Sequence, residues 1–201
     1  REGFKKPIGQ RDYDPRPMHH NRLRSDYSGI FEKVEERKLT VATCSLAGCF
    51  GCHMSFLDID ERIVDLIEHV EFDRSPINDI KHCSEHVDIG LIEGGVCNTE
   101  NIATLREFRK SCKVLVAVGA CAISGGVPAL RNNIDVRELL EESYIDGVCV
   151  ENAQIPTDPE LPHILEKVSP IHEVVKVDFF LPGCPPPADA IWQILTDILD
   201  W

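Results

Sequence analysis

The chain has 201 residues, nine cysteines and a formal net charge of −13. Such an acidic chain lacks the basic footprint that nucleic acids or anionic membrane surfaces require, and no apolar run approaches the roughly 20 residues of a membrane-spanning helix. An odd number of unevenly spaced cysteines, with no recognisable export signal, favours metal ligation or redox chemistry in a reducing, cytoplasmic compartment over a disulfide framework.

The first 37 residues differ in character from the rest of the chain. Pro7, Pro15 and Pro17 interrupt any periodicity, and charges of both signs are mixed among them. We expect residues 1–37 to form an N-terminal extension without its own core, either flexible or lying along a partner. A helical turn around residues 31–37 is expected to lead into a single folded domain over residues 38–201.

Four short apolar segments of this domain are predicted to be strands. They cover residues 39–43, 87–92, 113–118 and 174–181. The third, Lys113-Val-Leu-Val-Ala-Val118, is apolar on both faces, as a central strand of a parallel sheet is.

Helices are predicted between these strands, after a loop over residues 45–57. The first helix is expected to begin at Asp58 as N-cap, with Glu61 three residues later. The second is expected to be capped by Thr99, the third to cover residues 136–142, and the last to open at Pro185–Pro187. Strands and helices in alternation predict an α/β fold with a doubly wound parallel sheet.

Four cysteines are predicted to meet at one edge of this sheet. Cys49 and Cys52 follow the first strand, Cys121 follows the third and Cys184 follows the fourth. Ligands of such sheets bind outside the carboxyl ends of the strands, and four thiolates from separate loops are the usual ligands of an iron–sulfur cluster. Glycines beside each cysteine would let the backbone approach a cluster closely.

A Cys-x-x-Cys pair alone also occurs in thioredoxin-like redox sites and in zinc sites. A redox pair leaves Cys121 and Cys184 unexplained, and structural zinc is usually bound by two close pairs rather than by one pair and two isolated cysteines. The full pattern therefore favours an iron–sulfur cluster.

Several segments, read together, resemble the small subunit of nickel–iron hydrogenases, and the run Cys52–Glu61 is most similar to the cytoplasmic NAD-reducing branch. The resemblance covers roughly residues 38–200. It rests on Gly48-Cys-Phe-Gly-Cys-His-Met-Ser-Phe-Leu57, Glu93-Gly-Gly95, Val118-Gly-Ala-Cys-Ala-Ile-Ser-Gly-Gly126 and Leu181-Pro-Gly-Cys-Pro-Pro-Pro187.

The resemblance implies a flavodoxin-like domain that holds one proximal [4Fe-4S] cluster. By position in the motifs, its ligands are Cys49, Cys52, Cys121 and Cys184. Hydrogen would be split at a nickel–iron centre on a partner large subunit, and this chain would pass the electrons to diaphorase subunits that carry flavin and further clusters. A subunit of this kind contributes electron transfer and no catalytic residue of its own.

Two other functions stay open at this point. The cluster-bearing subunit of quinone-linked complex I resembles this chain, but its two adjacent cysteines contrast with the separation by Phe50-Gly51 here. A zinc-stabilised, non-enzymatic interaction module is the other alternative. Flavin mononucleotide is the less favoured cofactor, because Cys49 and Cys52 occupy the loop where a flavodoxin-like sheet binds phosphate.

Other polar and thiol side chains are candidates for roles around the cluster. Glu93 is expected to be either a proton-path residue near a subunit interface, or a polar loop carboxylate or a cap. His53 is either a hydrogen-bond partner near the cluster or a surface residue. Cys97 either approaches the cluster or, as the favoured alternative, is an inert small buried residue. We expect packing roles for Cys44, Cys112 and Cys149, and a loop position for Cys83. Trp192 and Trp201 are expected to be packing or interface groups rather than electron relays.

Overall fold

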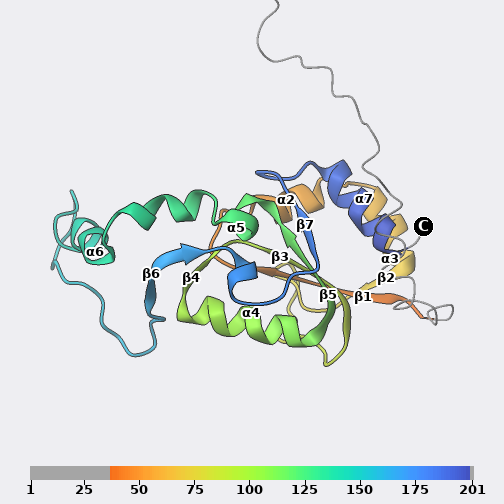
Figure 1. The fold of residues 1–201 in the computed structure, drawn as a ribbon, viewed down its shortest axis with the longest axis horizontal. Helices are drawn as coiled ribbons and strands as arrows, with labels where there is room; N and C mark the ends of the chain where they lie inside the picture. The colour runs from red at the N-terminus through yellow and green to blue at the C-terminus, as the bar shows by residue number, and fades with distance from the viewer. Residues whose placement is uncertain (1–36, 200–201) are drawn as a thin grey trace, which may run out of the picture. The chain divides into compact units, whose positions relative to one another are not determined.

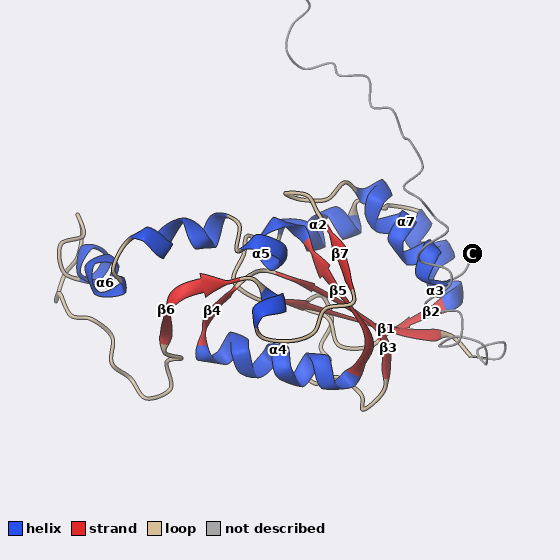
Figure 2. Ribbon diagram, in the orientation of Figure 1, coloured by secondary structure: helices blue, strands red, loops and turns tan. Residues whose placement is uncertain are grey.

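A five-stranded parallel sheet forms the centre of the computed structural model, which describes residues 37–199 (Figures 1 and 2). Its strands are β1 (Leu39–Ser45), β2 (Val70–Phe72), β3 (Val87–Glu93), β5 (Cys112–Val118) and β7 (Phe179–Leu181). The spatial order is β2-β1-β3-β5-β7, which is the order of flavodoxin-like doubly wound sheets. The predicted fold class is confirmed.

The strand pairing shows why the central segments form strands. Val41 of β1 lies opposite Ile89 of β3, which lies opposite Val114 of β5. Every residue of β3 is buried, because helices cover both faces of the sheet. A strand without a solvent face needs the near-continuous apolar run from which β3 and β5 were predicted.

Helices pack on both sides of the sheet. Figure 1 shows α4 on one face and α2, α3 and α7 on the other. Leu105 and Phe108 of α4 are fully buried in the core of the first face, and Ile191 and Leu195 of α7 are buried on the second. The helices are α2 (Gly51–Leu57), α3 (Arg62–His69), α4 (Thr99–Ser111), α5 (Gly119–Ser124), α6 (Val136–Tyr144) and α7 (Ala188–Leu199), with 3-10 turns η1 (Val127–Asn133) and η2 (Ile171–Glu173).

Two predictions about the region after β1 are wrong. Residues 45–57 are not all loop, because α2 begins directly after Phe50, whose left-handed φ of 66° turns the chain. Asp58 is the C-cap of α2, and α3 starts only after Glu61. The predicted helix exists as α3, but the residue chosen as its start, Asp58, belongs to the end of the preceding helix.

The other helix predictions hold with small shifts. Asn98 rather than Thr99 caps α4, because its side chain accepts a hydrogen bond from the backbone N–H of Asn101. The predicted helix at 136–142 is α6. The helix after Pro185–Pro187 is α7, which begins at Ala188.

The fourth predicted strand is much shorter than expected. Only Phe179–Leu181 pairs with β5, whereas Val174, Val175 and Val177 pack against the core without pairing. Asp178 attaches the chain to β5 just before β7 begins. Its carboxylate accepts hydrogen bonds from the N–H of Leu115 at 2.9 Å and from Arg109 at 2.6 Å.

A small second sheet went unpredicted. β4 (Val96–Asn98) and β6 (Ile164–Ser169) pair in antiparallel fashion, and the short edge strand β2 was also missed. The extension predicted for residues 1–37 lies outside the described residues, apart from Arg37. Within residues 37–199, no helix is long and apolar enough to cross a membrane.

Candidate cluster site at the carboxyl edge of the sheet

The four candidate ligands come from segments that follow three strands of the sheet. Cys49 lies between β1 and α2, and Cys52 lies in the first turn of α2. Cys121 lies in α5, directly after β5, and Cys184 follows β7. The structure therefore places all four beyond the carboxyl ends of parallel strands, where a ligand of this fold is expected.

The pKa values of Cys52 and Cys121 are raised in this site. Burial, reinforced by Glu93, raises the pKa of Cys52 to about 12, and the charges of Cys121 and Cys49 add to the rise. Burial also raises the pKa of Cys121. The hydrogen bond from the backbone N–H of Val127 lowers this pKa, and the charges of Cys184 and Cys49 raise it further. Like charges this close disfavour several thiolates together, so the site suits a positively charged centre that would stabilise them.

Glycine backbones lie directly against two of these sulfurs. Gly119 has φ +83°, and a Cβ added there would collide with Sγ of Cys52. Gly126 has φ +51°, and a Cβ there would lie 2.8 Å from Sγ of Cys121. Only glycine satisfies both the left-handed backbone and the close approach, so the surroundings of the sulfurs fit a cluster enclosed by backbone.

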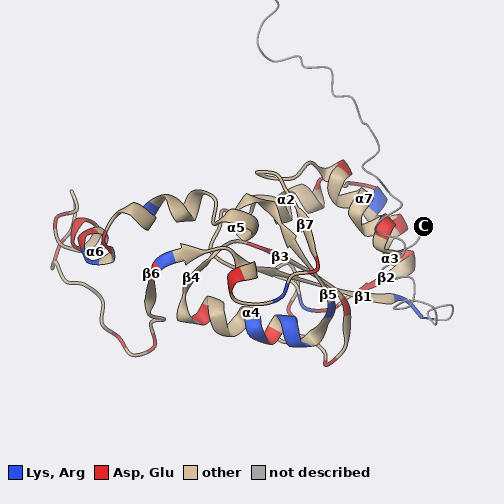
Figure 3. Ribbon diagram, viewed as in Figure 1, with Lys and Arg blue, Asp and Glu red and all other residues tan. Residues whose placement is uncertain are grey.

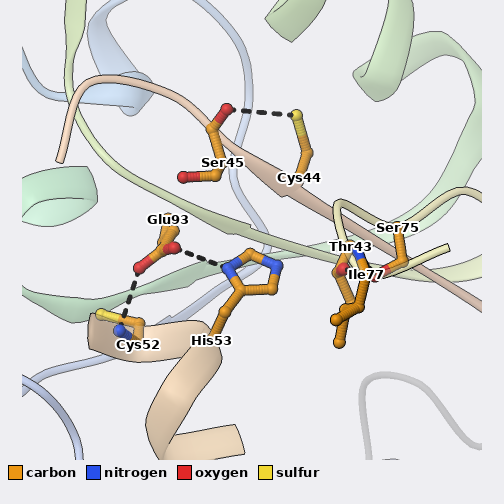
Figure 4. Close-up of polar contacts among 8 residues, drawn as sticks. All are labelled: Thr43, Cys44, Ser45, Cys52, His53, Ser75, Ile77 and Glu93. Atoms are coloured by element: carbon orange, nitrogen blue, oxygen red, sulfur yellow. Dashed lines mark hydrogen bonds and ion pairs between the residues drawn. The ribbon is translucent and has the colours of Figure 1, made fainter. Parts of the chain in front are cut away.

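A buried carboxylate fixes the helix that carries Cys52 (Figure 4). Glu93, the last residue of β3, accepts a hydrogen bond from the N–H of Cys52 at 3.0 Å. Its second oxygen lies 2.6 Å from Nδ1 of His53. Burial alone would raise the pKa of Glu93, but the hydrogen bonds from His53 and Cys52 hold it below its ordinary value. Glu93 therefore caps α2 as a charged group, in agreement with the capping alternative.

His53 is a buried residue and not a surface one. It is 5% exposed, and its ring stacks on Phe50 with centroids 4.6 Å apart. Its Nε2 is buried without a hydrogen-bond partner among the described residues. His53 thus links the left-handed turn at Phe50 to the end of β3.

Two further hydrogen bonds join the cysteine-bearing segments. The hydroxyl of Ser55 in α2 donates to the carbonyl of Pro186 at 2.5 Å. The N–H of Ala120 in α5 donates to the carbonyl of Gly183 at 2.8 Å. The segment around Cys184 is therefore attached to both of the helices that carry the other thiols.

The edge is open to solvent at two of the four thiols. Cys49 and Cys184 are exposed, whereas Cys52 and Cys121 are partly buried. Among residues 37–199, no three His, Cys, Asp or Glu side chains converge closely enough to hold a single metal ion.

The remaining cysteines have different surroundings. Cys44 and Cys112 are buried in the core as predicted, and Cys83 lies in a loop that packs against that core. Cys97 is partly buried, and its thiol donates to the side chain of Asn101 at 3.3 Å. The packing role predicted for Cys149 is wrong, because this residue is exposed in a segment that has no buried residue.

The tryptophans have different outcomes. Trp192 is partly buried, and the guanidinium of Arg62 lies over its ring, 5.3 Å from the centroid. Trp201 lies outside the described residues.

Comparisons with known proteins relate the chain to subunits of hydrogenases and of NADH ubiquinone oxidoreductase. Residues 49–198 match the family described as the 20 kDa subunit of NADH ubiquinone oxidoreductase. The delta subunit of the NAD-reducing hydrogenase HoxS of Cupriavidus necator is 48% identical, over 82% of this chain and 80% of that subunit. A chain in a crystal structure of an NAD+-reducing nickel–iron hydrogenase in the H2-reduced state superposes with a TM-score of 0.80 at 56% identity, covering 82% of this chain and 92% of that one.

More distant relatives are longer. A subunit of the F420-non-reducing hydrogenase of Methanothermobacter thermautotrophicus is 39% identical over 81% of this chain, which spans only 54% of that protein.

The chain belongs to the family of the 20 kDa subunit of NADH ubiquinone oxidoreductase, which unites it with complex I subunits. Within that family it belongs to the small subunits of NAD-reducing nickel–iron hydrogenases.

Proposed function

We propose that this chain carries electrons from a nickel–iron centre on a partner large subunit, through one [4Fe-4S] cluster, to a diaphorase module that reduces NAD+. The observation that carries the proposal is the convergence of four thiols at the carboxyl edge of the sheet, two of them open to a partner. The NAD-reducing hydrogenase relatives support both the hydrogen-splitting partner and the NAD-linked acceptor. We place the complex in the cytoplasm.

In this proposal Cys49, Cys52, Cys121 and Cys184 bind the cluster, which supplies a one-electron store between donor and acceptor. The chain itself sets the surroundings of that store. Burial, net charge and backbone N–H groups near the sulfurs determine the reduction potential of such a centre. The chain therefore needs no nucleophile or general base of its own.

Glu93 contributes by holding α2 in place. Its carboxylate receives the N–H of Cys52 and faces Nδ1 of His53, so both oxygens are engaged within the chain. We infer a positioning role for Glu93 and keep the proton-path role as the second candidate. A fall in hydrogen–deuterium exchange activity of Glu93→Gln at unchanged iron content would favour the proton path.

The proposal is tested by replacing each of the four cysteines with serine in the anaerobically purified complex. Iron and acid-labile sulfide per chain, and the electron paramagnetic resonance signal of the reduced complex, should fall in every variant. Cys83→Ser is the matched control, because Cys83 is also a free, partly exposed thiol but is not one of the four candidate ligands. Full iron and sulfide in any of the four variants would remove that residue from the ligand set.

The two alternative functions give different results in the same preparation. A zinc-stabilised module would contain zinc without sulfide. A quinone-linked role, suggested by the family match, would appear as quinone reduction without a nickel-containing partner. Nickel in the purified complex and hydrogen-dependent NAD+ reduction would exclude both.

A further inference from the structure

Residues 126–167, which we call the arm, contain no buried residue. The arm comprises η1, α6, the chain that returns from α6, and the first part of β6. Figure 1 shows α6 and the returning chain standing apart from the central sheet. A segment of this length without a buried side chain gains little from hydrophobic burial within its own chain.

The arm nevertheless carries most of the exposed apolar side chains. Nine of the fifteen large exposed hydrophobic residues of the described chain lie in it. Val148 is 94% exposed and Leu130 is 73% exposed. Concentrated apolar exposure of this kind marks a surface that binds another protein. The nine residues are Val127, Leu130, Ile134, Tyr144, Ile145, Val148, Val150, Leu161 and Ile164.

The base of the arm is fixed to the body of the protein. The side chain of Asn132 donates to the carbonyl of Val168 at 2.8 Å and accepts from its N–H at 2.7 Å. Arg131 donates to the carbonyl of Leu165 at 2.7 Å. These bonds join the outgoing and returning segments, so the arm leaves the body in a defined direction.

The arm begins at the cluster edge. Gly126, its first residue, packs against Cys121, and the backbone N–H of Val127 donates to that thiol. Val127 itself is 66% exposed. A partner that covers Cys121 would therefore also contact the start of the arm.

The charge of the arm restricts what binds it. The arm contains nine acidic and three basic residues, a net charge of −6, and Figure 3 shows acidic residues on α6 and the returning chain. Two copies of this chain would repel each other through such a surface. The complementary partner has an apolar face bordered by Lys and Arg.

We infer that the arm is a docking surface for the large subunit that carries the nickel–iron centre. The inference rests on the proposed function, because electrons enter at the cluster edge only if the donor subunit lies over it. The arm begins at that edge beside Cys121, so a large subunit that covers the edge would also contact the arm. Its apolar side chains are then covered in the complex, which accounts for their exposure in the chain alone.

The test compares acidic substitutions in the arm with one elsewhere, in the complex purified through a tag on this chain. Leu130→Asp changes the base of the arm and Val148→Asp its outer part. Val64→Asp in α3 is the matched control, since Val64 is 61% exposed. We expect nickel recovered per chain to fall about tenfold or more in each arm variant, as for central interface residues. Nickel in the control, and flavin and circular dichroism in every variant, should remain as in the wild type.

The possible results separate this inference from the proposed function. Wild-type levels of nickel in both arm variants would overturn the inference. Loss of flavin with retention of nickel would also overturn it, because the arm would then bind the acceptor module. Either result leaves the proposed function standing, as the wild-type complex still contains nickel. A wild-type complex without nickel would instead overturn the proposed function, and the inference with it.

Discussion

The carboxylate of Glu93 lies 2.6 Å from Nδ1 of His53, although 40 residues separate them in sequence. This contact connects the end of β3 to the helix that carries Cys52. Both side chains are almost fully buried, so the contact is shielded from solvent. It determines where the first turn of α2 lies relative to the sheet.

Replacing Glu93 by glutamine should destabilise the protein. The amide keeps the shape but loses the charge, and only one of its two ends can accept a hydrogen bond. A buried hydrogen bond to a charged group contributes about 1.5–3 kcal/mol, so the thermal midpoint should fall by roughly 3–10 °C. Glu68→Gln, at an exposed position of α3, is the control. A midpoint within about 1 °C of wild type for Glu93→Gln would contradict the capping role.

Gly119 offers a sharper test of the enclosure around the sulfurs. Gly119→Ala places a Cβ against Sγ of Cys52 at a backbone φ of +83°, which costs roughly 1–3 kcal/mol for a non-glycine residue. Displacement of that sulfur should lower iron and sulfide per chain.

Gly48→Ala is the matched control for this variant. Gly48 precedes Cys49, but a Cβ there would approach nothing closer than 3.4 Å. Equal iron content in the two alanine variants would show that the backbone approach at Gly119 does not matter for the site.

Buried thiols of the core should make stability fall at alkaline pH. Burial raises the pKa of Cys44 from 9.0 to about 11 and that of Cys112 from 9.0 to about 12. The unfolded chain then releases protons above about pH 9 while the folded chain retains them, so the free energy of unfolding decreases. The slope is about 1.4 kcal/mol per pH unit for each thiol.

Urea unfolding at pH 8 and pH 10 measures this effect. The double variant Cys44→Ala/Cys112→Ala should lose less stability between the two pH values than the wild type, whatever its stability at pH 8. Cys149→Ala changes an exposed thiol and should keep the wild-type dependence. The same slope in all three proteins would refute the assignment to the core thiols.

The central part of the fold was predictable because it depends on local sequence. Buried strands such as β3 and β5 need continuous apolar runs, and the parallel sheet then brings the segments with Cys49, Cys121 and Cys184 to one edge. Residues 164–169, in contrast, include Glu166 and Lys167 and form a strand only because β4 pairs with them.

The parts that sequence reasoning missed depend on contacts between distant residues. The start of α2 is fixed by the bond between Glu93 and the N–H of Cys52, 41 residues apart. No local pattern distinguishes this from a loop. The exposure of Cys149 was missed for a related reason. The apolar residues around it suggest that it lies in a core, but Val148 and Val150 are themselves exposed in this chain.

The attachment of the arm gives the last prediction. Asn132 makes two hydrogen bonds to the backbone of Val168, and Asn132→Ala would leave both backbone groups without this partner, at a cost of about 1–3 kcal/mol each if they stay buried. The base of the arm should therefore open more often, and limited proteolysis of the purified chain should cut within residues 126–167 several times faster. Asn133→Ala is the control, because the neighbouring Asn133 is exposed. Equal cleavage rates in the two variants would mean that the Asn132 bonds do not hold the arm, and that its direction is set by η1 and the β4–β6 pairing instead.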